Sequence, residues 1–122
     1  MQEFKLKKAD AGEVLLPRVK RAESFSSRFM GLMGRKSLSP DEGLHFPRCS
    51  SIHMFFMSFP IDVVYLDGEN RVKKIVHGLK PWRLSWCPFA KSVLEASAGW
   101  ARRVGLEQRD ALEFTPQDGE QE

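Results

Sequence analysis

Three residues with metal-binding side chains, Cys49, His53 and Met57, stand at intervals of four, and His45 lies four residues before them. Thiolate, imidazole and thioether groups are the donors of blue-copper sites, so this spacing raises the question of a metal. The residues between them are mostly apolar and are typical of a strand. In an extended chain at ~3.3 Å per residue, Cys49 and His53 lie about 13 Å apart, too far for one ion. We therefore predict no metal and no cofactor here.

An extended segment from Cys49 to Met57 places alternate side chains on opposite faces of a strand. The first face then carries polar groups among aromatic and apolar ones: Cys49, Ser51, His53, Phe55 and Met57. The second face is apolar: Ile52, Met54 and Phe56. A mixed face is typical of a pocket wall, which needs a mostly apolar lining and a few polar groups. The alternative is a histidine and a thiol buried in the core, and the sequence leaves both open.

Two carboxylates, Asp62 and Glu95, stand inside apolar segments that have the composition of strands. A buried charge needs partners, and the candidates are Arg28 and Arg83. One interpretation is structural, with ion pairs or backbone hydrogen bonds that fix the strands. The other is a site for an anion or polar ligand, or an acid–base pair of the two carboxylates acting with His53.

The two cysteines, Cys49 and Cys87, are too few for a disulfide scaffold or a four-thiolate zinc site. We expect reduced thiols, although the spacing does not decide whether the two are paired. Residues 1–8 contain no apolar core of a secretory signal, and no stretch reaches the ~18–20 apolar residues of a membrane span. A cytoplasmic location without a membrane span is the default expectation.

Length and composition predict one globular domain: 122 residues, of which 42% are hydrophobic and 29% charged, with a net charge of +3. Residues 1–39 carry nine Lys and Arg against four Asp and Glu, but these cations are spread along the chain. We therefore expect no nucleic-acid partner. Residues 1–114 are predicted to form a single β-rich domain, and residues 115–122 a flexible acidic tail.

The hydrophobic pattern changes period along the chain and predicts the elements that would hold these residues. Period-two alternation indicates strands, and the helical period is confined to about residues 24–35. Expected strands are 3–9, 14–22, 51–57, 61–66, 71–76, 82–86, 93–96 and 111–114, with the 61–66 and 71–76 pair as a hairpin. We expect a mainly β fold, an antiparallel sandwich or barrel, with one short amphipathic helix and a possible second helical turn at about 99–105.

Several motifs, taken in order, resemble the uncharacterised prokaryotic family called domain of unknown function 192. They are Arg28 to Met33, Gly43 with Phe46, Pro60 to Asp67, Val93 to Glu95 with Ala98-Gly99, and Gly105-Leu106 with Asp110. The resemblance implies a compact β-sandwich or barrel with the Gly-Leu-Met segment on a short helix, and it implies no reaction. This chain departs from the family pattern at three places: His53 stands for a tryptophan, Phe55-Phe56 for Lys-Asn, and Arg109 for a glycine.

From these features we expect a non-catalytic module that binds a small polar or anionic ligand, or a peptide. The candidate ligand-binding residues are Arg28, Met33, Cys49, His53, Asp62, Arg83 and Glu95. Two alternatives stay open. One is a hydrolase or lyase that uses Asp62 and Glu95 with His53. The other is a protein-interaction domain that docks through Trp82, Trp86 and Trp100. Exposure of these three side chains would favour this alternative.

Overall fold

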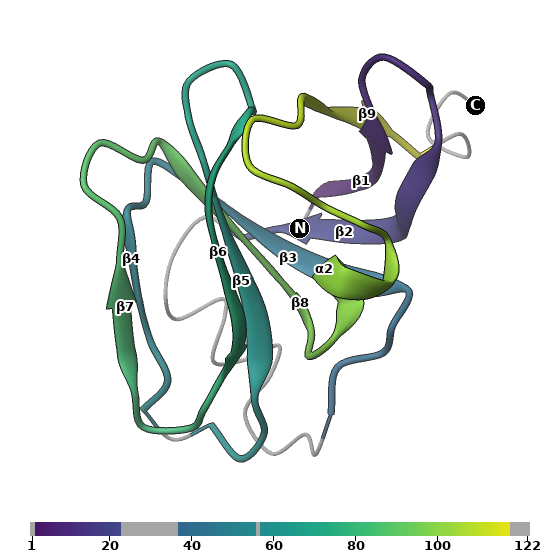
Figure 1. The fold of residues 1–122 in the computed structure, drawn as a ribbon. Coiled ribbons are helices and arrows are strands. Elements are labelled where there is room, and N and C mark those ends of the chain that lie inside the picture. The colour runs from purple at the N-terminus through teal and green to yellow at the C-terminus, as the bar shows by residue number, and fades with distance from the viewer. Residues whose placement is uncertain (1, 23–36, 56, 118–122) are drawn as a thin grey trace.

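In the computed structural model, the described residues are 2–22, 37–55 and 57–117, and they form one mainly β domain (Figure 1). Its strands are β1 (Gln2–Lys8), β2 (Val14–Arg21), β3 (Glu42–Pro47), β4 (Ser51–His53), β5 (Ile61–Leu66), β6 (Val72–Leu79), β7 (Leu84–Trp86), β8 (Ser92–Ser97) and β9 (Leu112–Pro116). A four-residue helix, α2 (Trp100–Arg103), follows β8. The mainly β prediction is confirmed. In the described part of the chain, no helix has the length and hydrophobicity that crossing a membrane requires.

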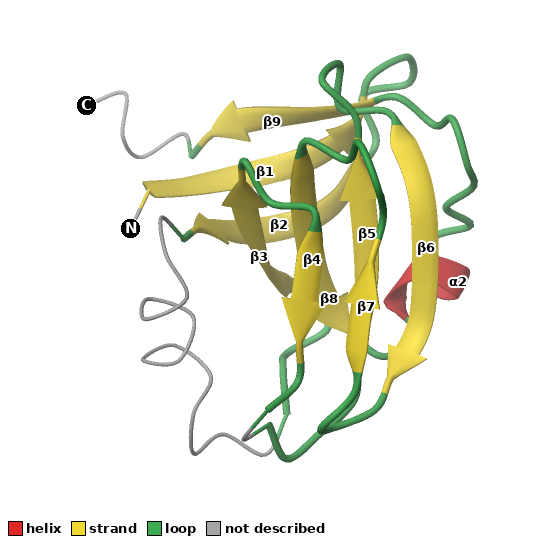
Figure 2. Ribbon diagram, turned by 90° about the vertical axis from the view of Figure 1, so that its left-hand side faces the viewer, coloured by secondary structure: helices red, strands yellow, loops and turns green. Residues whose placement is uncertain are grey.

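Seven strands form one sheet in the order β6-β5-β8-β3-β2-β1-β9, and β4 and β7 form a separate two-stranded sheet in front of it (Figure 2). All pairings are antiparallel except β2 with β3. A parallel pair needs a long connection, and residues 22–41 separate these two strands. At one corner the sheet closes on itself, because an isolated bridge joins Arg71, before β6, to Ala111, before β9.

The two faces of the large sheet carry separate apolar cores. One core lies between the sheet and the β4–β7 pair, and includes Ile52, Met54, Val63 and Tyr65. The other lies on the opposite face beside α2, and includes Leu16, Val64 and Leu94. Alternation along β5 explains the division, since Val63 and Val64 point to opposite faces.

Several predicted elements are confirmed, with shifted ends. The hairpin of β5 and β6 forms as expected, and the possible helical turn at about 99–105 is α2. Strand β9 continues through Pro116, two residues beyond the end expected for the domain, and the Gln117 amide donates to the carbonyls of Phe4 and Pro17. The amphipathic helix expected at 24–35 lies outside the described residues.

Candidate functional site

Asp62 is a fully buried carboxylate that is held by backbone groups. Its Oδ1 accepts a hydrogen bond from the Gly78 N–H and its Oδ2 from the Ala101 N–H, both at 2.9 Å. Gly78 has a φ of 61°, a conformation that favours glycine, and lies where the β5–β6 register shifts. The carboxylate thus ties β5 to an irregular part of β6 and to the start of α2. The expected partner Arg83 instead lies exposed at the surface.

Glu95, also fully buried, lies on the other face of the sheet from Asp62. The β5–β8 register pairs Asp62 with Ala96 and Val63 with Glu95. Directly opposite residues share a face and neighbours along a strand alternate, so the two carboxylates point in opposite directions. An acid–base pair made of these two groups is excluded by this register.

Among the described residues of the segment from Cys49 to Met57, only Ser51–His53 form a strand, so the prediction of one long strand is wrong. The chain turns after His53, and the Met57 N–H donates to the Met54 carbonyl at 3.3 Å. Met54 and Met57 are both buried, although alternation had placed them on opposite faces. The predicted wall is therefore shorter, and only its central part, Ser51 and His53, lies opposite the buried Ile52.

The two cysteines are free thiols. Cys49 is partly buried, and its Sγ donates to the Ser51 carbonyl at 3.0 Å, while Cys87 is buried. Within the described residues, no group of three or more His, Cys, Asp or Glu side chains could hold a metal ion. Arg28 and Met33, two of the predicted ligand-binding residues, lie outside the described residues.

The outer side of the β4–β7 pair carries a row of aromatic and apolar side chains. On β7, Ser85 points inward and its Oγ accepts a 2.9 Å hydrogen bond from the Tyr65 hydroxyl, so Leu84 and Trp86 point outward. Leu84 and Trp86 are 58% and 61% exposed. Large apolar side chains that are this exposed side by side indicate a contact surface.

Rings from β4 and from the neighbouring turns extend this row. His53 lies opposite Leu84 in the β4–β7 register. Its ring lies 4.9 Å from that of Phe55, which in turn stacks on Trp82 at 5.9 Å. We call the set the aromatic face: His53, Phe55, Trp82, Leu84 and Trp86. It contains two of the three tryptophans that the interaction hypothesis named, whereas Trp100 is buried and donates to the Leu15 carbonyl.

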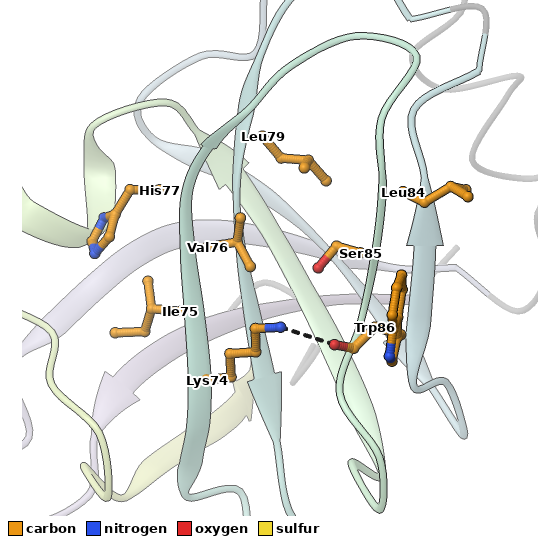
Figure 3. A pocket seen from close by; sticks show the side chains of 8 residues that line it. All are labelled: Lys74, Ile75, Val76, His77, Leu79, Leu84, Ser85 and Trp86. Carbon is orange, nitrogen blue, oxygen red and sulfur yellow. Dashed lines mark hydrogen bonds between the residues drawn. The ribbon is translucent and has the colours of Figure 1, made fainter.

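A groove of about 590 Å³ separates β7 from β6 (Figure 3). Its lining comes from these two strands alone: Lys74, Ile75, Val76, His77, Leu79, Leu84, Ser85 and Trp86. The Lys74 ammonium crosses the groove and donates to the Trp86 carbonyl at 3.0 Å. Leu84 and Trp86 belong both to this groove and to the aromatic face, so the two features form one continuous candidate site.

His45 is a buried titratable group away from this site. Its Nδ1 accepts a hydrogen bond from Arg21 Nε at 3.1 Å, and its ring lies 4.4 Å from that of Phe114. Burial, and then the positive charge of Arg21, lower the pKa of His45 from 6.5 to about 4. The imidazole is therefore neutral at pH 7 and serves as an acceptor inside the fold.

Comparison with known proteins identifies the family to which the chain belongs. The family described as "Uncharacterized ACR, COG1430", the domain of unknown function 192, matches residues 6–114. The chain belongs to this family. Its curated relatives include a UPF0127 protein of Thermococcus kodakarensis, 36% identical over 105 residues, which are 81% of this chain and 66% of that protein. A UPF0127 protein of Pyrococcus horikoshii is 36% identical over 104 residues, 79% of this chain and 86% of that protein.

Solved structures of the same fold come from two bacteria. A Sinorhizobium meliloti protein, named as a candidate transcription regulator, matches with a TM-score of 0.76 and 26% identity over 93% of this chain and 92% of that one. A Novosphingobium aromaticivorans protein of unknown function matches with a TM-score of 0.74 and 24% identity, covering 91% of this chain and 83% of that one. These comparisons establish the family and the fold, and the family has no known function.

The prediction of site residues from the sequence missed Lys74 and Leu84, and it placed Phe55 on the expected pocket wall without counting it among the ligand-binding residues. One signal was present: residues 70–94 contain no Asp or Glu, yet include Arg71, Lys73, Lys74, Lys80, Arg83 and Lys91. A long stretch of cations with interspersed aromatic residues indicates a surface for an acidic or aromatic partner.

Proposed function

We propose that the protein is a non-catalytic module that binds an extended segment of another polypeptide along the groove between β6 and β7. One observation carries the proposal: two strands that each have an unpaired edge line the same groove. Among the described strands, β6 pairs with β5 alone and β7 with β4 alone. The other edge of β6 is bonded at its start, where Val72 exchanges backbone hydrogen bonds with Arg109 and Asp110, and the groove lies beyond this point, from Lys74 to Leu79. An added strand can pair with such an edge through its backbone, and the side chains around it give specificity.

The hydrogen bonds of β7 support this use of its edge. The Met54 N–H donates to the Arg83 carbonyl, and the Cys87 N–H donates to the Ser50 carbonyl. In an antiparallel pair, backbone groups point alternately toward the partner and away from it. The polar backbone groups of Leu84 and Trp86 therefore point away from β4. The bond from Lys74 to the Trp86 carbonyl agrees with this direction.

Lys74 occupies one of the acceptors that a bound strand would use. An incoming peptide N–H would replace its ammonium on the Trp86 carbonyl, and the lysine would then return to water or pair with a carboxylate of the peptide. Such an exchange keeps the carbonyl satisfied in both states, which lowers the cost of opening the groove.

Peptide binding fits the site better than the other two hypotheses. A small anionic ligand would need cations converging on a closed pocket, whereas this groove runs along β6 from Lys74 to Leu79 between two strands. Hydrolase or lyase chemistry with Asp62 and Glu95 has no support, because the two carboxylates are buried on opposite faces of the sheet.

A library of displayed twelve-residue peptides, selected against the purified protein, tests the proposal. The best peptide is then synthesised in two versions: one is N-methylated at the odd-numbered residues, and the other at the even-numbered residues. These are the two methylation phases. Strand addition predicts that one phase abolishes binding and that the other leaves it nearly unchanged, because only alternate N–H groups face the protein. Amide chemical-shift changes should centre on residues 74–79 and 84–86.

Two results would overturn the proposal. One is a library in which no sequence is enriched over the same selection against Trp86→Ala. The other is a selected peptide for which both methylation phases are equally harmful or equally harmless. Duplex DNA serves as a parallel probe, since one structural relative is named as a candidate transcription regulator. DNA binding without peptide binding would assign the surface to another class of partner.

A further inference from the structure

Strand β7 is flanked on both sides by a tight turn of the same kind. In the turn Lys80–Arg83, the Arg83 N–H donates to the Lys80 carbonyl at 3.3 Å, and in Cys87–Ala90, the Ala90 N–H donates to the Cys87 carbonyl at 3.2 Å. The second residue of each turn is a proline and the third is aromatic, Pro81-Trp82 and Pro88-Phe89. Trp82 has a φ of 67° and Phe89 a φ of 68°. These features define type II turns.

The third position of a type II turn requires a positive φ and is ordinarily glycine or asparagine. A bulky side chain there is strained, because its Cβ crowds the backbone. Burial does not compensate for the strain, since Trp82 is 58% exposed and Phe89 is 84% exposed. Two strained aromatic side chains that remain in solvent at both ends of one strand point to a role in contact with a partner.

The charged residues on the chain segment through these turns are all cations, and Lys91 also lies beside the β5–β6 turn, which carries Asp67 and Glu69. Lys80 and Arg83 belong to the first turn and Lys91 follows the second, and all three are exposed. Between Glu69 and Glu95 the chain has no acidic residue. A partner that lies along β7 therefore meets cations at both ends and gains from acidic side chains of its own.

We infer that Trp82 and Phe89 are paired anchors that bracket a bound acidic peptide lying along the open edge of β7. The inference rests on the proposed function and deepens it by specifying the chemistry of the partner. The extended chain between the two turns, from Arg83 to Cys87, spans about 13 Å at ~3.3 Å per residue, so the peptide region between the anchors is at least about four residues long. It carries acidic residues that alternate with apolar ones, and the apolar ones pack beside Leu84 and Trp86.

Two synthetic nine-residue peptides test this inference. They share Leu and Val at alternate positions and differ only in the intervening residues, which are Glu in one and Lys in the other. Fluorescence anisotropy should show the Glu peptide binding at least about tenfold more tightly at low salt, with the difference shrinking as salt screens the charges. Trp82→Gly and Phe89→Gly should each weaken binding by about tenfold or more, as expected for aromatic anchors.

Stability measurements separate an anchor from a structural residue. Both glycine variants should keep or raise the midpoint of thermal unfolding, because glycine adopts the left-handed conformation without strain. Asn70→Gly is the matched control: Asn70 has a φ of 60° in the turn that joins β5 to β6, outside the aromatic face. It should leave binding unchanged. Loss of stability in parallel with loss of binding would overturn the anchor role.

The outcomes distinguish this inference from the proposed function. If the selected peptides are neutral or basic and the two methylation phases differ in their effect on binding, the proposed strand addition is supported. The inference that the partner is acidic is then wrong. If no peptide binds, both fail. Vesicles of phosphatidylcholine and phosphatidylserine form the last arm, because exposed aromatic residues among cations also suit an anionic membrane surface. Vesicle binding without binding of the Glu peptide would also overturn the inference.

Discussion

The surroundings of Asp62 and the aromatic face differ in which kind of side chain is buried and which is exposed. Asp62 is a charged group that is fully buried, and both of its oxygens accept backbone hydrogen bonds. The aromatic face and the turns beside it hold large apolar groups that are exposed, two of them in a strained conformation. A buried polar group with its bonds made is explained by the fold itself. Exposed, strained apolar groups are not, so the second region is the better guide to function.

Substitution of Asp62 should produce the largest effect on stability. Asp62→Ala leaves the N–H groups of Gly78 and Ala101 buried without acceptors, at about 1–3 kcal/mol each. We expect the free energy of unfolding, measured with urea, to fall by on the order of 4 kcal/mol. Asp62→Asn keeps one acceptor and should lose roughly half of that.

Asp67→Asn provides the matched control for Asp62. The Asp67 Oδ1 also accepts two backbone N–H bonds, from Glu69 and Arg71, but in an exposed turn where water can replace them. Its cost should stay below about 1 kcal/mol. If Asp62→Asn lowered the free energy of unfolding as little as Asp67→Asn does, the Asp62 carboxylate would not hold β5, β6 and α2 together.

A pH titration should show the second-largest effect, through His45. Because burial and Arg21 lower the pKa of His45 to about 4, the unfolded chain binds a proton between pH 6.5 and 4 that the folded protein does not. Stability from this group is fully present above pH 6.5 and is lost as the pH falls toward 4. With ~1.4 kcal/mol per pH unit, the loss is about 3 kcal/mol.

His45→Gln isolates this contribution. A glutamine carbonyl can still accept the hydrogen bond from Arg21, but it does not titrate. The difference in unfolding free energy between the protein and this variant should therefore change between pH 7 and pH 4. A difference that stays constant over that range would show that His45 is protonated in the folded state too.

The sequence was sufficient for most of the strands and for the buried character of Asp62. Period-two alternation is local, so β1, β2 and the β5–β6 hairpin could be predicted from it. Which residues share a face across strands depends on register, which is set by long-range pairing. That is why Asp62 and Glu95 could be suspected as a pair, although the β5–β8 register separates them.

The site was harder to predict than the fold. The apolar run after Cys49 suited a longer strand, because a buried turn with two methionines has the same composition as a strand. The Pro81-Trp82 and Pro88-Phe89 pairs carried a readable turn signal, since proline is favoured at the second position of a type II turn. Their aromatic residues favour strands, however, and that propensity hid the turns.

Removal of the Tyr65 hydroxyl tests how the aromatic face is fixed to the core. Tyr65→Phe deletes the buried bond to Ser85 and should cost about 1 kcal/mol of unfolding free energy. Burial raises the pKa of Tyr65 above its usual 10.0, so the bond persists at neutral pH and its contribution falls as the pH rises above about 10. Amide exchange in residues 84–86 should quicken in the variant. Unchanged exchange would mean that other contacts hold β7.

The smallest predicted effect has the opposite sign and bears most directly on function. Phe89→Gly removes a left-handed aromatic residue, which relieves about 1–2 kcal/mol of strain. Glycine also lowers the stability by about 0.5–1 kcal/mol, because it increases the conformational entropy of the unfolded chain. Little burial is lost, because Phe89 is 84% exposed. The free energy of unfolding, measured with urea, should therefore rise by roughly 0.5–1 kcal/mol. A side chain that serves to bind a partner lowers the stability of the protein alone. A loss of stability would mean that Phe89 packs in solution and that the contrast with Asp62 is weaker than the structure indicates.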